Sequence, residues 1–343
     1  MRAVRLHTFG PAENLRYERA DDPVPGPGQV RIAVAAAGVH LLDTALRQGM
    51  TGPYSAPAEL PTIPGREVAG TVEALGAGVA AGLLGKRVVA HLGMVPGGYA
   101  ELAVTDTGRL HEIPECLDEA EAVAMIGTGR TALGILLRAD LRSGDIALVP
   151  AAAGGIGTLL VQYAKNVDAT VIGLAGGPAK VARVAENGAD LAVDYTLPDW
   201  PARVRRFLRD RGADRSAGLG ADQGATVVFD SVGGAAGLAA VDLLARGGRH
   251  LVFGRSGMGP DDGSPLAFTA EELAERGITS ESVLGPAMIE RAGGLRALEE
   301  RSLAEAESGR LRPAVQRFPL AEAARAHRAL ETRGTMGKVV LEP

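Results

Sequence analysis

Cysteine is almost absent from this chain of 343 residues, which contains only Cys116. A single cysteine can form neither an internal disulfide bond nor a multi-cysteine metal site. The six histidines are scattered and show no HxH or HExxH spacing. His40, His91 and Glu101 would have to converge from separate segments to bind zinc, and their spacing does not support this. The sequence therefore predicts no bound metal.

Long apolar runs and blocks of basic charge are also missing. No uncharged apolar run reaches about 18 residues, and the N-terminal segment lacks the apolar core of a signal peptide. We therefore expect a cytoplasmic protein that does not span a membrane. Lys and Arg together number 36 against 41 Asp and Glu, which gives a net charge of −5. This mildly acidic balance argues against nucleic acid as a partner.

Two domains are predicted from the way the secondary-structure pattern changes along the chain. Residues 1–122 contain short strand-like segments separated by Gly- and Pro-rich turns, a pattern typical of a barrel-like β fold. Over residues 123–265 strand-like and helical segments alternate, which indicates parallel βαβ units. Lys338–Glu342 (KVVLE) is predicted to be a strand that returns to the first domain. We thus predict a β domain of residues 1–122 and 266–343 with an inserted α/β domain of residues 123–265.

The sharpest motif is a glycine-rich turn between a predicted strand and a predicted helix, IALVPAAAGGIG at residues 146–157. In this context glycines let a pyrophosphate approach the backbone, and the helix N-terminus attracts its charge. The candidate pyrophosphate-binding residues are therefore Gly154, Gly155, Ile156 and Gly157, and Gly157 also allows the helix to pack closely on the strand. An ordinary turn between a strand and a helix is the alternative.

The next strand distinguishes between the two nicotinamide dinucleotides. It ends in LAGGPAK, residues 174–180, without the Asp or Glu that usually binds the ribose 2′-hydroxyl of NAD. Lys180 and Arg183 follow instead, and cations attract the 2′-phosphate of NADPH. The sequence therefore favours NADPH over NADH. The alternative for Lys180 is a position on a solvent-exposed helix face.

Motifs along essentially the whole chain resemble those of the zinc-independent medium-chain dehydrogenase/reductase superfamily, in particular the NADPH:quinone oxidoreductase (zeta-crystallin-like) family. They include VPGPGQVRIAVAAAGVHLLDTALRQG at 24–49, IPGREVAGTVEALGAGV at 63–79, AAAGGIGTLLVQYAK at 151–165 and FDSVGG at 229–234. Zinc-dependent members carry Gly-His-Glu where this chain has Gly65-Arg66-Glu67. The resemblance implies a GroES-like β-barrel-type catalytic domain, an inserted Rossmann domain with a doubly wound parallel sheet, and NADPH in the cleft between them.

The resemblance also implies roles for individual residues. The positions that bind the 2′-phosphate in NADPH-using relatives are matched here by Lys180, Tyr195 and Arg333. The residues that line the path of the nicotinamide are matched by Ser231, Val232, Phe253 and Gly254, and a threonine near the nicotinamide is matched by Thr131.

Two departures from the family pattern lie near the substrate. The family commonly has Asn at the position of His40 and Tyr at the position of Thr51, and the nearest tyrosine here is Tyr54. Enoyl reductases of this superfamily often use that tyrosine as a proton donor. The departure therefore argues against reduction of an enoyl thioester.

The implied activity is hydride transfer from NADPH to a quinone or a similar conjugated carbonyl compound. His40 is the candidate hydrogen-bond or proton donor to the acceptor oxygen, or else it only holds its loop. Asp43 either orients His40 or caps the following helix. Tyr54 is a substrate-side donor or wall, or a loop aromatic.

Two other functions remain open at this point. One is the reduction of α,β-unsaturated ketones or aldehydes in a biosynthetic pathway, and the other is a non-catalytic role for an NADPH-binding protein. The family also implies a homodimer, formed by pairing of Rossmann edge strands such as Arg249–Gly254, because pairing removes an exposed edge.

Overall fold

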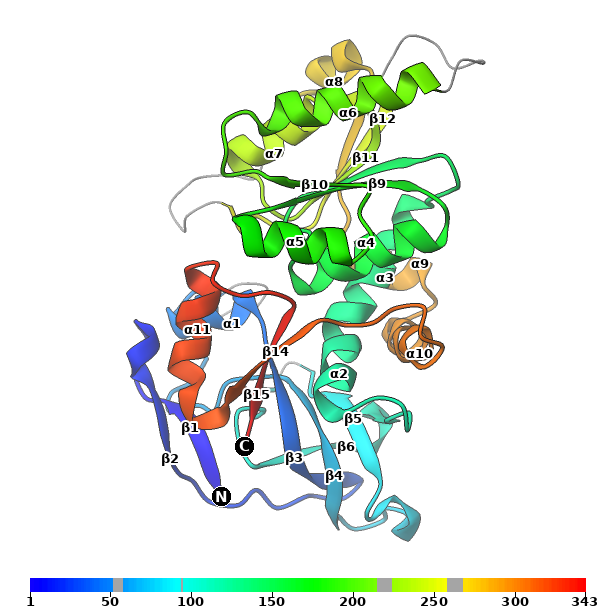
Figure 1. Ribbon diagram of the computed structural model, residues 1–343. Helices are drawn as coiled ribbons and strands as arrows, with labels where there is room; N and C mark the ends of the chain where they lie inside the picture. The colour runs from blue at the N-terminus through cyan, green and yellow to red at the C-terminus, as the bar shows by residue number, and fades with distance from the viewer. Residues whose placement is uncertain (52–57, 94, 215–223, 258–267) are drawn as a thin grey trace. The chain divides into compact units, whose positions relative to one another are not determined.

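The computed structural model describes residues 1–51, 58–93, 95–214, 224–257 and 268–343, and its ribbon is drawn in Figure 1. The chain divides into two compact units. Unit 1 comprises Met1–Arg130, Glu299–Gly309 and Pro313–Pro343, and unit 2 comprises Thr131–Leu298 and Arg310–Arg312.

Unit 1 is built on a mixed sheet with the strand order β14-β15-β3-β4-β5-β7, and β6 pairs with β3. β14 and β15 are parallel, and the other pairs are antiparallel. A separate antiparallel pair joins the first two strands. The strands are β1 (Arg2–Leu6), β2 (Leu15–Arg19), β3 (Gln29–Val39), β4 (Glu67–Leu75), β5 (Arg87–His91), β6 (Leu102–Asp106), β7 (Leu110–Glu112), β14 (Val315–Pro319) and β15 (Lys338–Glu342).

Short helices connect and flank these strands. The α-helices are α1 (Leu41–Arg47), α2 (Glu119–Val123), α10 (Leu295–Glu307) and α11 (Ala323–Glu331), and single 3₁₀ turns are η1 (Ala12–Asn14), η2 (Ala81–Leu83), η3 (Thr107–Arg109) and η5 (Leu320–Glu322). α10 begins in unit 2 and continues into unit 1.

The core of unit 1 follows from the alternation of side chains along its strands. In β3, Val30, Ile32 and Val34 are buried at every second position, as a strand with one face on a core requires. They belong to one apolar cluster with side chains of the neighbouring strands, such as Val72 of β4 and Leu341 of β15.

Unit 2 contains a parallel sheet with the strand order β10-β9-β8-β11-β12-β13. In chain order this is 3-2-1-4-5-6, the order of a Rossmann fold. The elements are α3 (Arg130–Ala139), β8 (Ile146–Val149), α4 (Gly155–Asn166), β9 (Thr170–Ala175), α5 (Pro178–Glu186), β10 (Leu191–Asp194), α6 (Trp200–Asp214), β11 (Ala225–Asp230), α7 (Gly234–Val241), β12 (Leu244–Val252), α8 (Ala270–Arg276), β13 (Thr279–Ser282) and α9 (Pro286–Arg291).

All six residues of β9 are buried, because helices cover both faces of this sheet. Figure 1 shows α4 and α5 on one side of the sheet and α6 and α7 on the other. The strand order reverses between β8 and β11, and ligands of such sheets bind at the carboxyl ends of the strands beside this point.

The predicted combination of a β unit and a Rossmann unit is confirmed, but the boundaries between the two units differ from those predicted. The division falls at Arg130 instead of residue 122, and the chain returns to unit 1 at Glu299 instead of residue 266. The segment in between stays in unit 2 because β13 pairs with β12, from Arg249↔Thr279 to Val252↔Ser282. Its sequence, TSES, carries no apolar alternation from which a strand could be predicted.

The same pairing corrects the prediction that Arg249–Gly254 lies at a sheet edge. β12 lies between β11 and β13, so within the described residues the edge on this side is β13. Arg249 itself is turned inward and donates to the carbonyl of Ala139.

A continuous helical run from Glu119 to Ala139 combines α2, a π-helical turn η4 (Ala124–Gly129) and α3. By length and composition this run could cross a membrane, but 78% of its most apolar window is buried inside the protein, as is typical of a core helix. Every residue of η4 is buried. π-Helical turns of this kind are often found at functional sites.

Candidate active site

The predicted dinucleotide turn follows β8 at the point where the strand order reverses. Ala151 has a φ of 52°, Gly154 caps α4, and the helix begins at Gly155. The backbone N–H groups of Gly155, Ile156 and Gly157 donate to no carbonyl among the described residues. Three unused N–H groups at a helix N-terminus suit a phosphate or pyrophosphate.

Gly157 must be glycine for this turn to keep its shape. A Cβ atom at this position would lie 2.4 Å from the carbonyl oxygen of Ala151 and 2.8 Å from the Cα atom of Ala152. The helix therefore packs directly on the turn, as the motif predicts. Gly154 is less crowded, since its Cβ would meet only Ala151 O at 3.3 Å.

The turn after β9 lies beside Tyr195, as the two predicted 2′-phosphate residues of unit 2 require. The backbone N–H of Tyr195 donates to Ala175 O over 3.2 Å, and a Cβ on Gly176 would lie 3.8 Å from the Tyr195 hydroxyl. Lys180 is half-buried in the first turn of α5, just after this turn. The β9–α5 turn and Tyr195 are therefore neighbours.

Sequence reasoning overlooked Asp194, an acid at the end of the neighbouring strand β10. Its Oδ1 atom accepts hydrogen bonds from the hydroxyl and the N–H of Thr196, at 2.6 Å and 3.0 Å. These bonds and one from the Gly177 N–H hold the pKa of Asp194 below its usual range. The carboxylate is thus already used by the turns around it.

The predicted nicotinamide residues of unit 2 form two turns that lie against each other. The N–H of Phe253 donates to Asp230 O, and a Cβ on Gly254 would lie 2.9 Å from Ser231 O. The Ser231–Gly233 turn is fixed by Asp230, whose Oδ1 accepts the N–H groups of Val232 and Gly233, both at 2.8 Å. Ser231, Val232, Phe253 and Gly254 are therefore brought together, and their role at the nicotinamide stays a prediction.

A buried chain of side chains holds Asp230 in turn. His250 Nε2 lies 3.1 Å from Asp230 Oδ2, and His250 Nδ1 lies 2.8 Å from the hydroxyl of Ser280 on β13. Both Asp230 and His250 are fully buried. Burial opposes ionisation of Asp230, but His250 and the two N–H groups keep its pKa below the usual value.

Three further predicted residues belong to other segments of the chain. Thr131 belongs to α3 in unit 2, whereas Arg333 follows α11 in unit 1 with a φ of 55°. Tyr54 lies outside the described residues. The predicted roles of these three residues therefore stay predictions.

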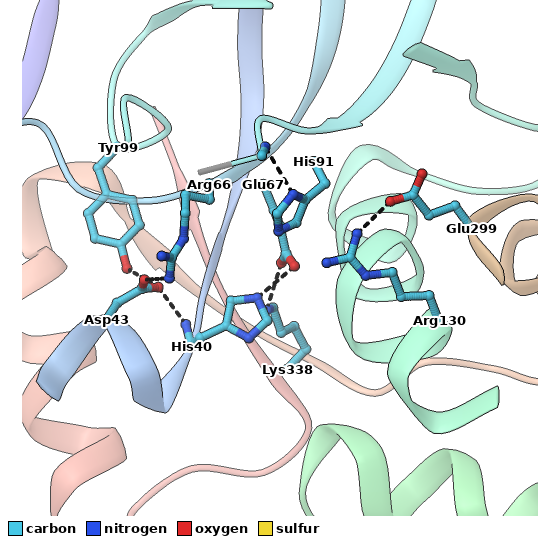
Figure 2. A network of polar contacts seen from close by, with 10 residues as sticks. His40, Asp43, Arg66, Glu67, His91, Tyr99, Arg130, Glu299 and Lys338 are labelled. Atoms are coloured by element: carbon cyan, nitrogen blue, oxygen red, sulfur yellow. Dashed lines mark hydrogen bonds and ion pairs between the residues drawn. The ribbon is translucent and has the colours of Figure 1, made fainter. Parts of the chain in front are cut away.

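His40 stands at the centre of a polar cluster in unit 1, which Figure 2 shows from close by. It lies between β3 and α1, and its side chain is 32% exposed, whereas those of Glu67 and Lys338 are almost completely buried. The Lys338 ammonium donates to His40 Nε2 over 2.7 Å and to Glu67 Oε2 over 2.8 Å. His40 Nε2 also lies 2.6 Å from Glu67 Oε1, so the imidazole contacts both the ammonium and the carboxylate. We call His40, Glu67 and Lys338 the His40 cluster.

The Glu67 carboxylate is charged and closely packed. Burial opposes its ionisation, but the charges of His40 and Lys338 hold the pKa of Glu67 well below its ordinary value. Two glycines make room for it: a Cβ on Gly127 would lie 1.5 Å from Oε1, and a Cβ on Gly38 would lie 2.4 Å from Oε2. Gly127 belongs to η4, so the π-helical turn is part of this site.

A second polar chain fixes the helix that follows His40. Asp43 Oδ2 accepts the backbone N–H of His40 over 2.8 Å, which caps α1, and Asp43 also accepts from Arg66 (3.0 Å) and from the Tyr99 hydroxyl (3.2 Å). The Tyr99 hydroxyl lies 3.1 Å from His327 Nε2. Burial beside Asp43 raises the pKa of Tyr99 well above its usual value. Arg66, at the position of a zinc ligand in zinc-dependent relatives, is therefore paired with Asp43.

His91 borders the cluster from β5. Its Nδ1 atom accepts the N–H of Gly93 over 3.0 Å, and burial together with the Arg130 charge lowers its pKa to about 4. Arg130 in turn pairs with Glu299. Glu101, considered with His40 and His91 as a possible ligand, instead accepts from the Arg2 N–H. Within the described ranges no group of three or more His, Cys, Asp or Glu could hold a metal ion.

Sequence reasoning missed Glu67 and Lys338, and it considered His91 only as a metal ligand. Lys338 gives the clearest retrospective signal, because a lysine begins the apolar strand KVVLE, and Glu67 likewise begins the strand EVAGTVEAL. A charged residue that enters a buried strand needs a partner. The spacing of 271 residues between them gives no indication that they pair.

We expect the protein to lose stability in mild acid because of two buried histidines, His91 and His327. Burial lowers the pKa of both His91 and His327 to about 4, whereas in the unfolded chain both titrate near 6.5. Between these values the unfolded chain binds more protons, so the free energy of unfolding falls as the pH falls from about 6.5 to about 4. We expect a decrease of about 2–4 kcal/mol between pH 7 and pH 5, at about 1.4 kcal/mol per pKa unit.

Urea unfolding followed by circular dichroism at pH 7 and pH 5 measures this decrease. Circular dichroism is needed because the one tryptophan, Trp200, lies in unit 2 and both histidines lie in unit 1. His327→Gln should reduce the pH dependence. Equal midpoints at both pH values would contradict the prediction.

The units match two family models. Residues 26–115 match the alcohol dehydrogenase GroES-like domain, and residues 155–292 match the family described as zinc-binding dehydrogenase. The quinone oxidoreductase of Pseudomonas aeruginosa is 32% identical over 99% of this chain and 99% of that protein. The 2-haloacrylate reductase of a Burkholderia species is 31% identical over 99% of this chain and 98% of that protein.

A solved structure has the same arrangement of elements. The quinone oxidoreductase of Escherichia coli in complex with NADPH matches with a TM-score of 0.81, at 26% identity over 100% of both chains. These matches show that the chain belongs to the quinone oxidoreductase family of the medium-chain dehydrogenase/reductase superfamily.

Proposed function

We propose that the chain is an NADPH-dependent, zinc-independent reductase that transfers hydride to a quinone or a similar conjugated carbonyl compound. The observation that carries this proposal is the turn at Gly154–Gly157, whose three unused N–H groups fit a pyrophosphate, in a chain similar over 99% of its length to a quinone oxidoreductase. NADPH supplies the hydride when bound.

The residues of this chain then have distinct tasks. The N–H groups of the Gly155–Gly157 segment hold the pyrophosphate, and Lys180 and Tyr195 hold the 2′-phosphate. The two turns that contain Ser231 and Gly254 support the nicotinamide. His40 donates a hydrogen bond to the acceptor oxygen, where negative charge develops.

Zinc-independence has support from the chemistry of the His40 cluster. The Lys338 ammonium lies within 2.8 Å of both Glu67 Oε2 and His40 Nε2, so a cation already occupies the space that these two potential ligands share. A second cation there would be repelled.

One alternative is the reduction of an activated carbon–carbon double bond, as in an α,β-unsaturated ketone or aldehyde. The likeness to a 2-haloacrylate reductase favours it specifically. An NADPH-binding protein without catalytic activity is the other alternative, and it differs from both enzymes in having no turnover.

The test is NADPH oxidation by the purified protein with 1,4-benzoquinone, 9,10-phenanthrenequinone and an enone in parallel, with NADH as control. Turnover of quinones with NADPH preference supports the proposal. Turnover of the enone alone supports the double-bond reductase. NADPH binding without any turnover supports the non-catalytic alternative.

Lys180 offers a separate prediction about the cofactor. Lys180→Ala should weaken NADPH binding about 10- to 150-fold, because a charge-assisted hydrogen bond to the 2′-phosphate contributes about 1.5–3 kcal/mol. NADH has no 2′-phosphate, so its affinity should not change. Fluorescence titrations with both nucleotides measure this, and Lys86→Ala, a surface lysine of unit 1, is the control. An equal effect on both nucleotides would mean that Lys180 does not contact the 2′-phosphate.

We also propose a cytoplasmic homodimer. β13 leaves one edge of the parallel sheet open within the described residues, and pairing with a second copy would satisfy its backbone groups. Light scattering after size-exclusion chromatography should give twice the mass of 35.2 kDa.

A further inference from the structure

We propose that His250 is a positioning residue for the nicotinamide of NADPH. Its imidazole is fully buried, so it acts on the nicotinamide only through Asp230 and the Ser231–Gly233 turn that Asp230 holds. The inference rests on the proposed function, because it requires that NADPH binds with its nicotinamide against this turn.

The place of His250 in the sheet brings it beside Asp230. In the parallel pairing of β11 and β12, His250 lies opposite Val228, and Asp230 is two residues further along β11. Side chains two residues apart in a strand point to the same face, so the imidazole reaches the Asp230 carboxylate. On its other side, β13 places Ser280 opposite His250. A polar chain therefore crosses three neighbouring strands, from Ser280 through His250 to Asp230.

Asp230 uses both of its carboxylate oxygens. Oδ1 accepts the N–H groups of Val232 and Gly233, both over 2.8 Å, and Oδ2 lies 3.1 Å from His250 Nε2. Burial opposes its ionisation, but these hydrogen bonds keep the pKa of Asp230 below its usual value. An ionised carboxylate only accepts, so His250 Nε2 donates to it. His250 therefore fixes the orientation of the carboxylate, and the carboxylate fixes the two N–H groups of the turn.

Ser280 completes the support from the other ring nitrogen. Its hydroxyl lies 2.8 Å from His250 Nδ1, so both nitrogens of the imidazole have a partner and the ring cannot turn without breaking a hydrogen bond. A buried ring with both nitrogens bound is a rigid strut between β13 and the end of β11.

The turn that this chain supports has few polar groups left for a ligand. Ser231 O accepts the N–H and the hydroxyl of Ser256, both over 2.9 Å, and Val232 O accepts the Gly257 N–H over 2.8 Å. Among the residues that the structure describes, the N–H groups of Ser231 and Gly254 donate to no partner. These two donors are left for the nicotinamide half of the cofactor. A displaced Asp230 carboxylate would move the turn, and the Ser231 N–H with it.

The effect of His250 should be confined to one half of the cofactor. The Gly154–Gly157 turn follows β8, and Lys180 and Tyr195 follow β9 and β10, whereas the polar chain runs through β11, β12 and β13. Loss of the imidazole should therefore disturb the nicotinamide and leave the groups for the pyrophosphate and the 2′-phosphate in place. Adenosine 2′,5′-bisphosphate carries the 2′-phosphate but no nicotinamide, so it separates the two halves.

The experiment compares His250→Leu, which removes the donor to Asp230, with His250→Gln, which keeps an N–H donor near the position of Nε2. His250→Leu should weaken NADPH binding about 5-fold, as the loss of one hydrogen bond does, and leave adenosine 2′,5′-bisphosphate binding unchanged. Its kcat with 1,4-benzoquinone should fall about 10- to 100-fold, because a displacement of about 1 Å can cost about 100-fold in rate. His250→Gln should recover most of both losses.

Thr226→Val is the matched control for a loss of stability alone. The Thr226 hydroxyl donates to Asp145 Oδ1 over 2.7 Å at the start of β11, whereas Asp230 lies at the end of this strand. Urea unfolding followed by the fluorescence of Trp200, the one tryptophan, measures the stability of unit 2 in each variant. The control should lose stability but keep the kcat and the NADPH affinity of wild type.

Ser280→Ala keeps the test decisive if His250→Leu does not fold. It leaves the imidazole in place and removes only its outer support, so kcat should fall about 2- to 10-fold, the effect of one neutral hydrogen bond. Adenosine 2′,5′-bisphosphate should again bind as in wild type.

The outcomes separate this inference from the proposed function. Wild-type kcat in the folded His250 and Ser280 variants overturns the positioning role alone. So does an equal loss of affinity for NADPH and adenosine 2′,5′-bisphosphate, or a Thr226→Val protein as slow as His250→Leu, since each marks a merely structural role. Wild-type protein that neither binds NADPH nor reduces an acceptor overturns the proposed function and this inference with it.

Discussion

Replacing Gly157 with valine should weaken NADPH binding at least about 100-fold. The new Cβ would lie 2.4 Å from Ala151 O and 2.8 Å from the Ala152 Cα atom, and both are backbone atoms that cannot rotate away. α4 must therefore move away from the turn after β8. The N–H groups of Gly155 and Ile156 would then no longer converge on one phosphate, and the contribution of several charge-assisted hydrogen bonds would be lost.

Fluorescence titration with NADPH measures this loss. The NADPH affinity of Gly157→Ala should lie between those of Gly157→Val and wild type, because alanine adds the clashing Cβ atom without the two methyl groups of valine. Gly82→Val is the control, since a Cβ on Gly82 meets no atom within 4 Å. Circular dichroism must show that the variants are folded. A folded Gly157→Val protein with wild-type affinity would mean that the dinucleotide binds elsewhere.

Glu67→Ala should lower the free energy of unfolding by about 3–5 kcal/mol, which is the usual cost of leaving one member of a buried ion pair alone. The Lys338 side chain is 4% exposed and has no other carboxylate within salt-bridge distance among the described residues. The space cleared by Gly38 and Gly127 would also be left as a cavity, which adds to the loss.

Urea unfolding followed by circular dichroism measures this free energy of unfolding. Glu112→Ala is the matched control, because its pair with Lys86 is solvent-exposed and contributes less than about 1 kcal/mol. Adding Lys338→Met to Glu67→Ala should restore part of the stability, since the unpaired charge disappears. If Glu67→Ala costs no more than Glu112→Ala, the buried pair does not contribute to folding.

The sequence predicts the residues expected to bind the cofactor better than the residues of the His40 cluster. The residues of the dinucleotide turn are neighbours in the chain, so Gly157 and its role follow from one short motif. Ser231 and Gly254 come from two strands whose order is that of a known fold. The proximity of Ser231 and Gly254 could therefore be predicted as well.

The His40 cluster could not be predicted in the same way. His40, Glu67 and Lys338 come from three strands whose pairing depends on the whole sheet of unit 1, and no local pattern connects them. The strand β13 was missed for a different reason. It is polar and lies at an edge, so its sequence lacks the apolar period that identifies a strand.

The position of β15 in the sheet has a consequence for how the protein is made. β15 lies between β14 and β3, and pairs with β3 across about 300 residues of chain that include all of unit 2. During synthesis the Glu67 carboxylate therefore lacks its Lys338 partner until the last residues of the chain have left the ribosome. Unit 2 can complete its sheet in that time, because domains generally fold as units while the chain grows. The nucleotide-binding turn would thus be in place before the His40 cluster is complete.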